Sequence, residues 1–463
     1  MKNSISLLVA GALALSLAGC SYDDKYTTDP NNPADAPIGT VLVQAEVGVG
    51  YTYGSDLARY DNQFTQQING IANQSLIIGH YNFKQQDTDQ MWDNLYRALY
   101  SFKDVRDKSL KLPAGNGYEY RALAYALMAH SYQVLTDHYG DIPFSDALRG
   151  ADALQPKFDK QENIYPALHA YLDSAIALSG KTSSLDIYIP GPSSDPIFGG
   201  DMTRLKAFAQ AMKARLYLHQ VKQDPALAQQ AYDFATAALA SGFTSVKVSF
   251  PGDGQTSESP LSQFASQRGD ITLCSTLVDS MTKYNDPRIY FYGDSTGFGA
   301  VVGAKPGEAT TDASPPGSYL NRVDAPIYLF SLSELQFILS EAAFRLTKND
   351  EAATAANAGV TASFAQVGAD GVADYLTANG TTTANVSLER IINQKWMSLF
   401  LDPEVWTDMR RTGFPVIPAP QDVESNGVFP RKWPYPQKER NLNSANVPTE
   451  SNPAISTRMW WDV

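Results

Sequence analysis

The sequence is dominated by segments in which apolar residues recur at helical spacing. The clearest one runs from Tyr118 to Tyr139 and is followed by Gly140, a residue type that readily ends a helix in the left-handed conformation. Five further segments show the same pattern: Ile164 to Leu178, Thr203 to Val221, Leu227 to Leu239, Leu332 to Leu346 and Leu388 to Leu401. This pattern predicts a mostly α-helical fold with little β-structure.

Several of these segments come in pairs with short connections. Asp224-Pro225, for example, lies between the segments Thr203 to Val221 and Leu227 to Leu239. Small residues gather on single helix faces: Ala124, Ala126 and Ala129, then Ala207, Ala209, Ala211 and Ala214. Such faces let a partner helix approach closely, as stacked tetratricopeptide-like hairpins require, although a strict repeat period is absent.

Three segments do not follow the helical pattern. Thr244 to Phe250 alternates like a short strand, and Gly293 to Tyr319 is rich in Gly, Pro, Ser and Thr. A loop of that length in a compact domain is usually functional or disordered. Pro403 to Pro453 is rich in Pro and Asn, and we expect irregular structure there, packed down by Trp406, Trp433 and Tyr435.

The N-terminus has the pattern of a lipoprotein signal. Lys2 precedes an apolar run from Ile5 to Ala18, which is too short to span a bilayer, and Leu17-Ala18-Gly19-Cys20 suits cleavage and lipidation. We therefore expect residues 1–19 to be a signal peptide and Cys20 to carry the lipid anchor; the alternative is an ordinary secretory signal. Residues 20–37 read as a flexible tether, and 38–463 as one α-helical domain.

The charge balance disfavours some partners. The chain has 36 Lys and Arg against 49 Asp and Glu, a net charge of −13, which repels phosphate backbones and argues against nucleic-acid binding. With Cys20 lipidated, Cys274 is the single remaining cysteine and no intrachain disulfide can form. The apolar residues around Cys274 indicate a buried side chain and not a nucleophile.

One motif permits a catalytic alternative. Gly293-Asp294-Ser295-Thr296-Gly297 fits the G-x-S-x-G spelling of a hydrolase nucleophile, and Ile289 to Tyr292 could supply the preceding strand. However, the five histidines all come earlier in the chain, and a Gly- and Pro-rich loop follows instead of a helix. No H-E-x-x-H, P-loop or Cys/His metal spacing occurs, so we predict no catalytic residues, no metal and no cofactor.

Aromatic and amide side chains suggest a ligand class. The chain holds 25 Tyr, 20 Phe and 6 Trp, and Tyr60 to Phe83 mixes aromatic residues with Gln and Asn. Rings offer flat faces to the C–H side of a sugar, and amides offer a donor and an acceptor to its hydroxyls. This combination suits a neutral, polar, ring-shaped ligand; the alternative is a polar helix whose Tyr and Phe lie in the core.

Several motifs follow one another along the chain. They are Tyr132-x-x-Leu135-x-Asp137-x-Tyr139-Gly140-Asp141-Ile142-Pro143-Phe144, Asp286-Pro287-Arg288, Ser333-Glu334-Leu335 to Glu341-Ala342, Gln394-Lys395-Trp396, Glu404-x-Trp406-x-Asp408-x-Arg410-Arg411-Thr412-Gly413-x-Pro415, and Arg431-x-Trp433-Pro434-Tyr435-Pro436. In this order they resemble the motifs of the SusD/RagB family of nutrient-binding outer-membrane lipoproteins, and the short N-terminal region is closer to that family's second branch.

The resemblance implies a tetratricopeptide-like helical scaffold with an irregular, loop-rich ligand-binding face. It also implies a partner, a TonB-dependent SusC-like barrel, and a place on the outer membrane facing the cell exterior; Asp23-Asp24 is similar to the family's acidic export signal. No catalytic residues carry over. The signature residues read as structural: Gly140 as a helix cap, Arg410 and Arg411 as partners of buried carboxylates or carbonyls, and Tyr435-Pro436 as a packed turn.

The resulting hypothesis is a cell-surface lipoprotein that binds an oligosaccharide and delivers it to the barrel. The alternatives are a peptide ligand, a structural lid without affinity of its own, and a surface hydrolase that uses Ser295. Irregular segments held by a rigid scaffold favour binding sites. We therefore expect one wall of the site from Tyr60, Gln66, His80 and Tyr81, and the other from Arg288, Tyr290, Tyr292 and Tyr319.

Overall fold

The computed structural model describes residues 36–254, 257–297, 299–422, 427–451 and 454–463. The predicted signal peptide, Cys20 and nearly all of the predicted tether lie outside these residues. Within them the chain is mostly helical and its strands are short, as the sequence predicts. None of the helices in this part of the chain combines the length and the apolar character needed to cross a bilayer.

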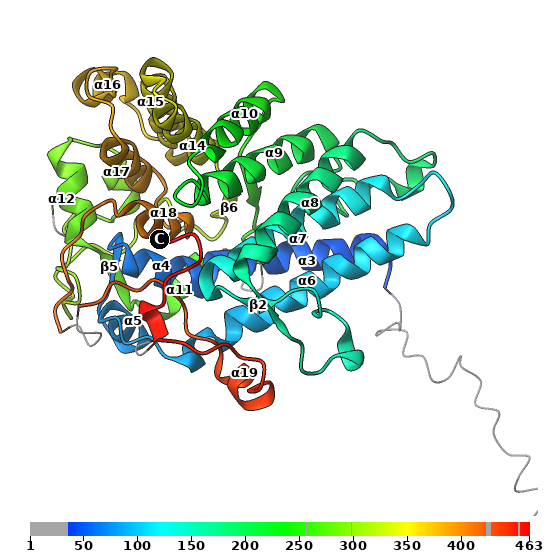
Figure 1. Ribbon diagram of the computed structural model, residues 1–463. Coiled ribbons are helices and arrows are strands. Elements are labelled where there is room, and N and C mark those ends of the chain that lie inside the picture. Colours follow the sequence, from blue (N-terminus) through cyan, green and yellow to red (C-terminus); the bar gives the residue numbers. More distant parts are fainter. Residues whose placement is uncertain (1–35, 255–256, 298, 423–426, 452–453) are drawn as a thin grey trace, which may run out of the picture.

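The scaffold is a series of long helices in which neighbours along the chain pack against each other (Figure 1). All six segments predicted from periodicity are helices. The long helices are α3 (Ile38–Thr52), α6 (Asp89–Leu110), α7 (Tyr118–Tyr139), α8 (Gln161–Ser179), α9 (Met202–His219), α10 (Leu227–Ala240), α14 (Leu332–Arg345), α15 (Asn349–Val367) and α17 (Leu388–Ser398). In Figure 1, α3, α6, α7 and α8 lie side by side, and α9, α10, α14 and α15 continue the stack.

Small residues allow these helices to pack closely. The alanines of α7 and α9 that the sequence singled out are fully buried in the common core: Ala124, Ala126, Ala129, Ala207, Ala209, Ala211 and Ala214. Gly359 of α15 faces the ring of Phe337 on α14, where an added Cβ would lie only 2.8 Å from the ring. The close packing of the helical hairpins therefore depends on small residues as much as on large apolar ones.

Shorter elements connect and flank the long helices. The helices are α4 (Ala58–Phe64), α5 (Asn73–Gly79), α11 (Pro260–Arg268), α12 (Ser275–Lys283), α13 (Ile289–Tyr292), α16 (Val372–Asn379), α18 (Glu404–Thr412) and α19 (Gln437–Leu442), with a π-helical turn at Tyr53–Leu57 and 3₁₀ turns at Gln85–Thr88, Gly150–Asp152, Asp186–Tyr188 and Ala454–Ser456. In Figure 1, α4, α5, α12 and β5 lie together at the end opposite the connection of α6 to α7.

The strands form three antiparallel pairs. They are β1 (Ile68–Gly70) with β5 (Ile271–Leu273), β2 (Ile142–Pro143) with β3 (Phe158–Asp159), and β4 (Val246–Val248) with β6 (Ile327–Phe330). β4 lies inside the predicted strand, which is thereby confirmed. The long loop from Gly293 to Tyr319 is irregular as predicted, and it is held on β5, because Ala304 N donates to Leu273 O at 2.9 Å and Leu273 N donates to Ser314 O at 2.8 Å.

The C-terminal segment departs in part from its prediction. It begins with a helix, α18, that follows α17 after a break at residues 399–403, so the expectation of irregular structure from Pro403 onward is wrong there. Val405, Trp406 and Met409 are spaced to place one apolar face of α18 inward. The predicted packing role is confirmed for Trp406, Trp433 and Tyr435, which are all buried.

The family-signature residues are structural, as the resemblance implies. Gly140 has φ 75° and its N–H donates to Thr136 O at 2.8 Å, which ends α7. Arg410 donates to Asp137 O at 2.6 Å, and Arg411 pairs with Glu341 and Asp408. The Tyr435 hydroxyl donates to Asp141 O at 2.8 Å. These contacts fasten the C-terminal segment to the helical scaffold.

Candidate functional site

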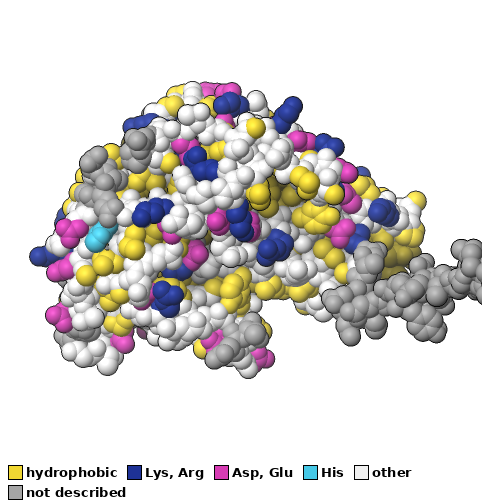
Figure 2. All heavy atoms as spheres, turned by 90° about the horizontal axis from the view of Figure 1, so that it is seen from below, with side chains coloured by type: hydrophobic (Ala, Val, Ile, Leu, Met, Phe, Trp, Pro, Cys, Tyr) yellow, Lys and Arg dark blue, Asp and Glu magenta, His cyan; other side chains and the backbone are white. Residues whose placement is uncertain are grey.

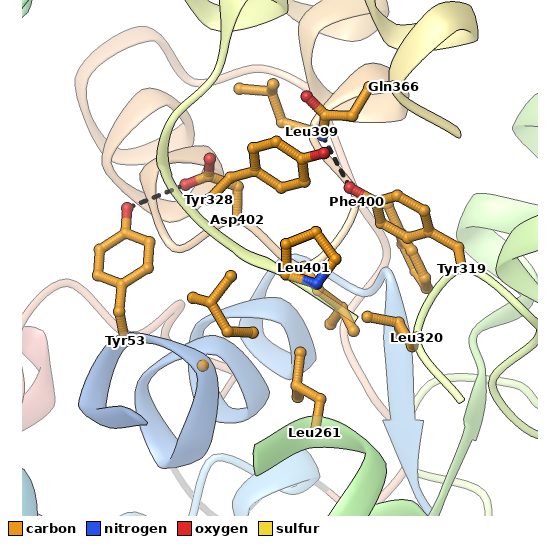
Figure 3. Close-up of a pocket in the computed structure, with 13 residues that line it drawn as sticks. Tyr53, Leu261, Tyr319, Leu320, Tyr328, Gln366, Leu399, Phe400, Leu401 and Asp402 are labelled. Atoms are coloured by element: carbon orange, nitrogen blue, oxygen red, sulfur yellow. Dashed lines mark hydrogen bonds between the residues drawn. The ribbon is translucent and has the colours of Figure 1, made fainter. Parts of the chain in front are cut away.

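An aromatic pocket opens where five segments distant in sequence meet (Figure 3). The segments are the π-helical turn after α3, the start of α11, residues 319–328, the end of α15, and residues 399–402 between α17 and α18. The pocket encloses about 410 Å³ of empty space, counted with the adjoining open solvent. It is lined by Tyr53, Gly54, Leu261, Tyr319, Leu320, Pro326, Ile327, Tyr328, Gln366, Leu399, Phe400, Leu401 and Asp402.

The polar groups of the pocket are anchored. The Tyr53 hydroxyl donates to Asp402 Oδ1 at 3.1 Å, and Glu404 N donates to the same oxygen at 2.9 Å. Gln366 Nε2 donates to the Tyr319 hydroxyl at 2.7 Å (Figure 3). Packing also fixes the ring of Phe400, which stacks on Tyr292 with centroids 4.3 Å apart. The pocket is thus preorganised, which reduces the entropy lost on binding.

Asp402 is the one acidic residue in the lining. Burial, followed by the nearby Glu334 carboxylate, raises the pKa of the Asp402 carboxyl to about 7. At and below that pH the carboxyl carries a proton for a substantial fraction of the time, so it can donate as well as accept a hydrogen bond. No lysine or arginine lines the pocket. This chemistry suits a neutral ligand with hydroxyl groups and an apolar face.

The predicted second wall is only partly present. Tyr319 lies in the pocket, as expected of a ligand-binding residue. Arg288, in contrast, is fully buried; it pairs with Asp286 and donates to the hydroxyls of Ser363 and Ser398, each at 2.8 Å. Tyr292 is buried behind Phe400. In this structure the side chains of Arg288 and Tyr292 support the pocket from the core, and their contact with a ligand stays a prediction.

The predicted first wall is divided in the same way. Tyr60 is a core residue in this structure, packed against Phe83 and Trp433 at centroid distances of 5.5 and 5.6 Å, and its contact with a ligand stays a prediction. Gln66 and Tyr81 line a second, tightly packed recess, and His80 lies beside it with Nε2 2.8 Å from Gly307 O. This contact joins the predicted first wall to the long loop, and ligand contact by Gln66, His80 and Tyr81 stays a prediction.

Tyr290 stands apart from both cavities. Its side chain is 62% exposed on α13, which makes it the most exposed aromatic ring of the predicted set. Sequence reasoning missed Tyr53, Tyr328, Phe400, Asp402 and Gln366. None of them carries a local signal, because even β6, which holds Tyr328, is a run of four apolar residues without alternation; these side chains reach the pocket through tertiary packing.

The hydrolase alternative lacks its structural context. Ile289–Tyr292 is a helix, so no strand leads into Ser295, and a loop follows it. None of the hydrogen bonds of the described residues joins Ser295 to a histidine. Cys274 is buried and burial raises the pKa of its thiol to about 11, which confirms the prediction of a buried side chain.

Two other hollows lie along α6. One lies in the groove between the packed helices α3 and α6, and the other lies between α6, the loop after β2 and Glu439 of α19. Counted with the adjoining open solvent, their volumes are about 590 and 760 Å³. Figure 2 shows the face on which α19 lies, with hydrophobic side chains gathered near its middle and charges of both signs interspersed. The second hollow contains Arg97, Asp93 and Glu439, so it offers a more charged lining than the aromatic pocket.

Comparisons with known proteins identify the family. Residues 30–436 match the model of the SusD-like family described as "Starch-binding associating with outer membrane". Among curated proteins, none matches this sequence.

Several solved structures share the fold. A chitin-binding SusD homologue from Flavobacterium johnsoniae is 23% identical, with a TM-score of 0.72 over 92% of this chain and 97% of its own. A SusD/RagB family protein from Bacteroides thetaiotaomicron is 20% identical, with a TM-score of 0.76 over 92% and 99%. A Bacteroidetes SusD-like protein is 21% identical, with a TM-score of 0.77 over 92% and 100%. The family model spans most of the chain and the fold agrees, so this protein belongs to the SusD/RagB family.

Proposed function

We propose that this protein is a cell-surface binding protein for an oligosaccharide and that the aromatic pocket holds one of its sugar units. The observation that carries the proposal is the pocket lining. It contains four aromatic rings, the Gln366 amide and the Asp402 carboxyl, whose pKa is raised to about 7, and it contains no lysine or arginine. The family description and the chitin-binding homologue support a glycan as the ligand class. The protein binds its ligand without chemical conversion.

The first prediction tests the pocket with the half-buried ring of Tyr328. Replacing Tyr328 with alanine removes one ring face and is expected to weaken oligosaccharide binding by about 1–2 kcal/mol, roughly tenfold in Kd. Calorimetric titration of residues 36–463 with chito- and malto-oligosaccharides measures the change, and neutral peptides test the alternative ligand class. Tyr290→Ala is titrated as well, because the two-wall hypothesis expects a similar loss there.

Tyr100→Ala is the matched control. Tyr100, like Tyr290, is an exposed tyrosine, but it lies on α6 and lines neither cavity. Its replacement is expected to leave the Kd unchanged. Equal Kd values for wild type and Tyr328→Ala, with both proteins folded, would contradict the proposal that a sugar unit binds in this pocket.

The anchor is the second proposal. Cys20 carries the lipid that holds the domain at the outer membrane, with residues 20–37 as the tether. Cys20→Ala is therefore expected to release a folded protein into the soluble fraction. The measurement is the share of the protein in the soluble and outer-membrane fractions of cells that lack the SusC-like barrel. Retention of Cys20→Ala in the outer-membrane fraction would contradict the anchor.

Delivery is the third proposal. The protein passes its ligand to a TonB-dependent SusC-like barrel and lies over it on the exterior face of the outer membrane. The family's described association with the outer membrane supports this arrangement. Loss of glycan binding in Tyr328→Ala without loss of the barrel complex would separate this role from that of a purely structural lid.

A further inference from the structure

A buried amide without partners marks the second cavity. Gln63, on α4, is 3% exposed, and neither its Oε1 nor its Nε2 has a hydrogen-bond partner among the described residues. Leaving such groups unpaired costs on the order of 1–3 kcal/mol each. An unpaired buried group in a native structure calls for an explanation, and a hydrogen bond made in another state of the protein supplies one.

Gln63 lines a tightly packed recess that leaves no room for a water molecule; its gaps, counted with the adjoining open solvent, amount to about 200 Å³, and we call it the amide cavity. Its other lining residues are Gln66, Ile68, Asn69, Gly79, Tyr81, Cys274, Pro306, Gly307 and Pro420. The lining contains three amide side chains and no charged side chain. Its chemistry therefore matches a neutral group with hydroxyls or an amide, and not an ion.

The backbone around the amide cavity is strained. Gln66 and Tyr81 have φ values of 58° and 60°, a left-handed conformation that non-glycine residues rarely adopt. Gln66 is held there because its Nε2 donates to Pro418 O at 2.6 Å and its Oε1 accepts from Thr276 Oγ1 at 2.6 Å. Strained positions of this kind cluster at ligand clamps and switch regions.

A short cover closes the cavity. Residues 305–308 lie over it, and the cover is fastened by a few contacts: Gly307 N donates to Asn69 Oδ1 at 2.8 Å, Asn69 Nδ2 donates to Glu308 O at 2.9 Å, and His80 Nε2 lies 2.8 Å from Gly307 O. Gln421 N also donates to Pro306 O at 2.8 Å. Segments with so few fastenings open at low free-energy cost compared with a core helix.

The amide cavity and the aromatic pocket share one segment of chain. Gln67, next to Gln66, donates to Leu399 O at 3.3 Å and accepts from Leu401 N at 2.8 Å. Leu399 and Leu401 line the aromatic pocket. A single peptide unit thereby links Gln66 to the wall of the aromatic pocket.

We propose that the amide cavity is the closed form of a second sugar subsite, which opens when the cover at 305–308 lifts and in which the Gln63 amide bonds to the ligand. The ligand group is a neutral sugar unit of the same oligosaccharide, so the inference rests on the proposed function.

Gln63→Leu tests the subsite, because leucine keeps much of the volume and removes the unpaired amide. The free variant is expected to melt about 1–3 °C higher than wild type, since it no longer buries unpaired groups. Its Kd for the oligosaccharide that wild type binds is expected to rise about tenfold. A higher melting temperature with an unchanged Kd would overturn the inference, and so would a lower melting temperature.

Cys274 provides a readout that needs no ligand. It lines the amide cavity and is the only cysteine of the described residues. Opening of the cover is expected to let iodoacetamide alkylate Cys274 in native buffer, at a rate nearly independent of low urea concentration. His80→Ala, which removes one fastening of the cover, should raise that rate about tenfold, while Tyr100→Ala should not.

The outcomes separate the two proposals. Alkylation that follows the urea dependence of global unfolding, with no effect of His80→Ala, overturns the opening of the cavity. A wild-type chain that binds none of the oligosaccharides overturns the sugar assignment of both sites. Binding by wild type with an equal Kd for Gln63→Leu overturns this inference and leaves the proposed function standing.

Discussion

Replacing Arg411 with methionine is expected to lower the free energy of unfolding by about 3–5 kcal/mol. The guanidinium is buried, and it donates to Glu341 Oε1 at 2.6 Å and, through Nε, to Asp408 Oδ1 at 2.9 Å. Burial raises the pKa of Glu341, but Arg411 and Arg345 outweigh it and hold that pKa at about 2. Methionine would remove the Arg411 charge and leave the buried Glu341 carboxylate with Arg345 as its remaining arginine partner.

Arg149→Met is the matched control, because Arg149 makes a 2.7 Å ion pair with Asp146 at the surface. Exposed pairs contribute roughly 0–1 kcal/mol, so this change should be small. Urea unfolding of both variants measures the difference. Similar losses in the two variants would contradict the view that Arg411 joins the C-terminal segment to α14.

The Asp402→Asn variant is expected to gain stability over wild type as the pH rises. The folded-state pKa of Asp402 is about 7, against 3.8 for the unfolded chain, so between these values the folded state keeps a proton that the unfolded state has lost. The stabilisation from this group is complete below the unfolded pKa and is lost as the pH rises to 7. Asparagine does not titrate, and its Oδ1 can still accept from Tyr53 and Glu404 N.

The size of this effect follows from the pKa difference. Each pKa unit corresponds to about 1.4 kcal/mol, so from pH 5 to pH 8 the stability of Asp402→Asn relative to wild type should increase by about 2–3 kcal/mol. Urea unfolding of both proteins at constant ionic strength across this range measures it. A stability difference that stays constant from pH 5 to pH 8 would contradict the raised pKa.

The helices show what local pattern can predict. α7 and the start of α14 agree with their predictions, because apolar periodicity and the Gly140 cap act within one segment. α15 was not predicted, since its buried face is mostly Ala and Gly, with Val360 and Phe364 only near its end, and gives little contrast with its polar face. α6 was missed although Met91, Trp92, Leu95 and Leu99 carry a clear helical spacing.

The site shows where local pattern stops. Tyr53, Phe400 and Asp402 become neighbours only after the helical scaffold brings residues about 350 positions apart together. Tyr60 and Arg288 resemble ligand contacts in composition, yet each has core partners that the sequence alone does not place: Trp433 for Tyr60, and Ser363 and Ser398 for Arg288. Aromatic content alone therefore does not identify the side chains that line the pocket.

The central claim is that a sugar unit lies in the aromatic pocket, and a crystal structure of residues 36–463 with the tightest-binding oligosaccharide tests it most directly. We expect electron density for a sugar ring against Tyr328 and Phe400, with a hydroxyl or acetamido group within hydrogen-bond distance of Asp402 or Gln366. Density for the bound oligosaccharide along α6, with the aromatic pocket unchanged, would contradict the claim.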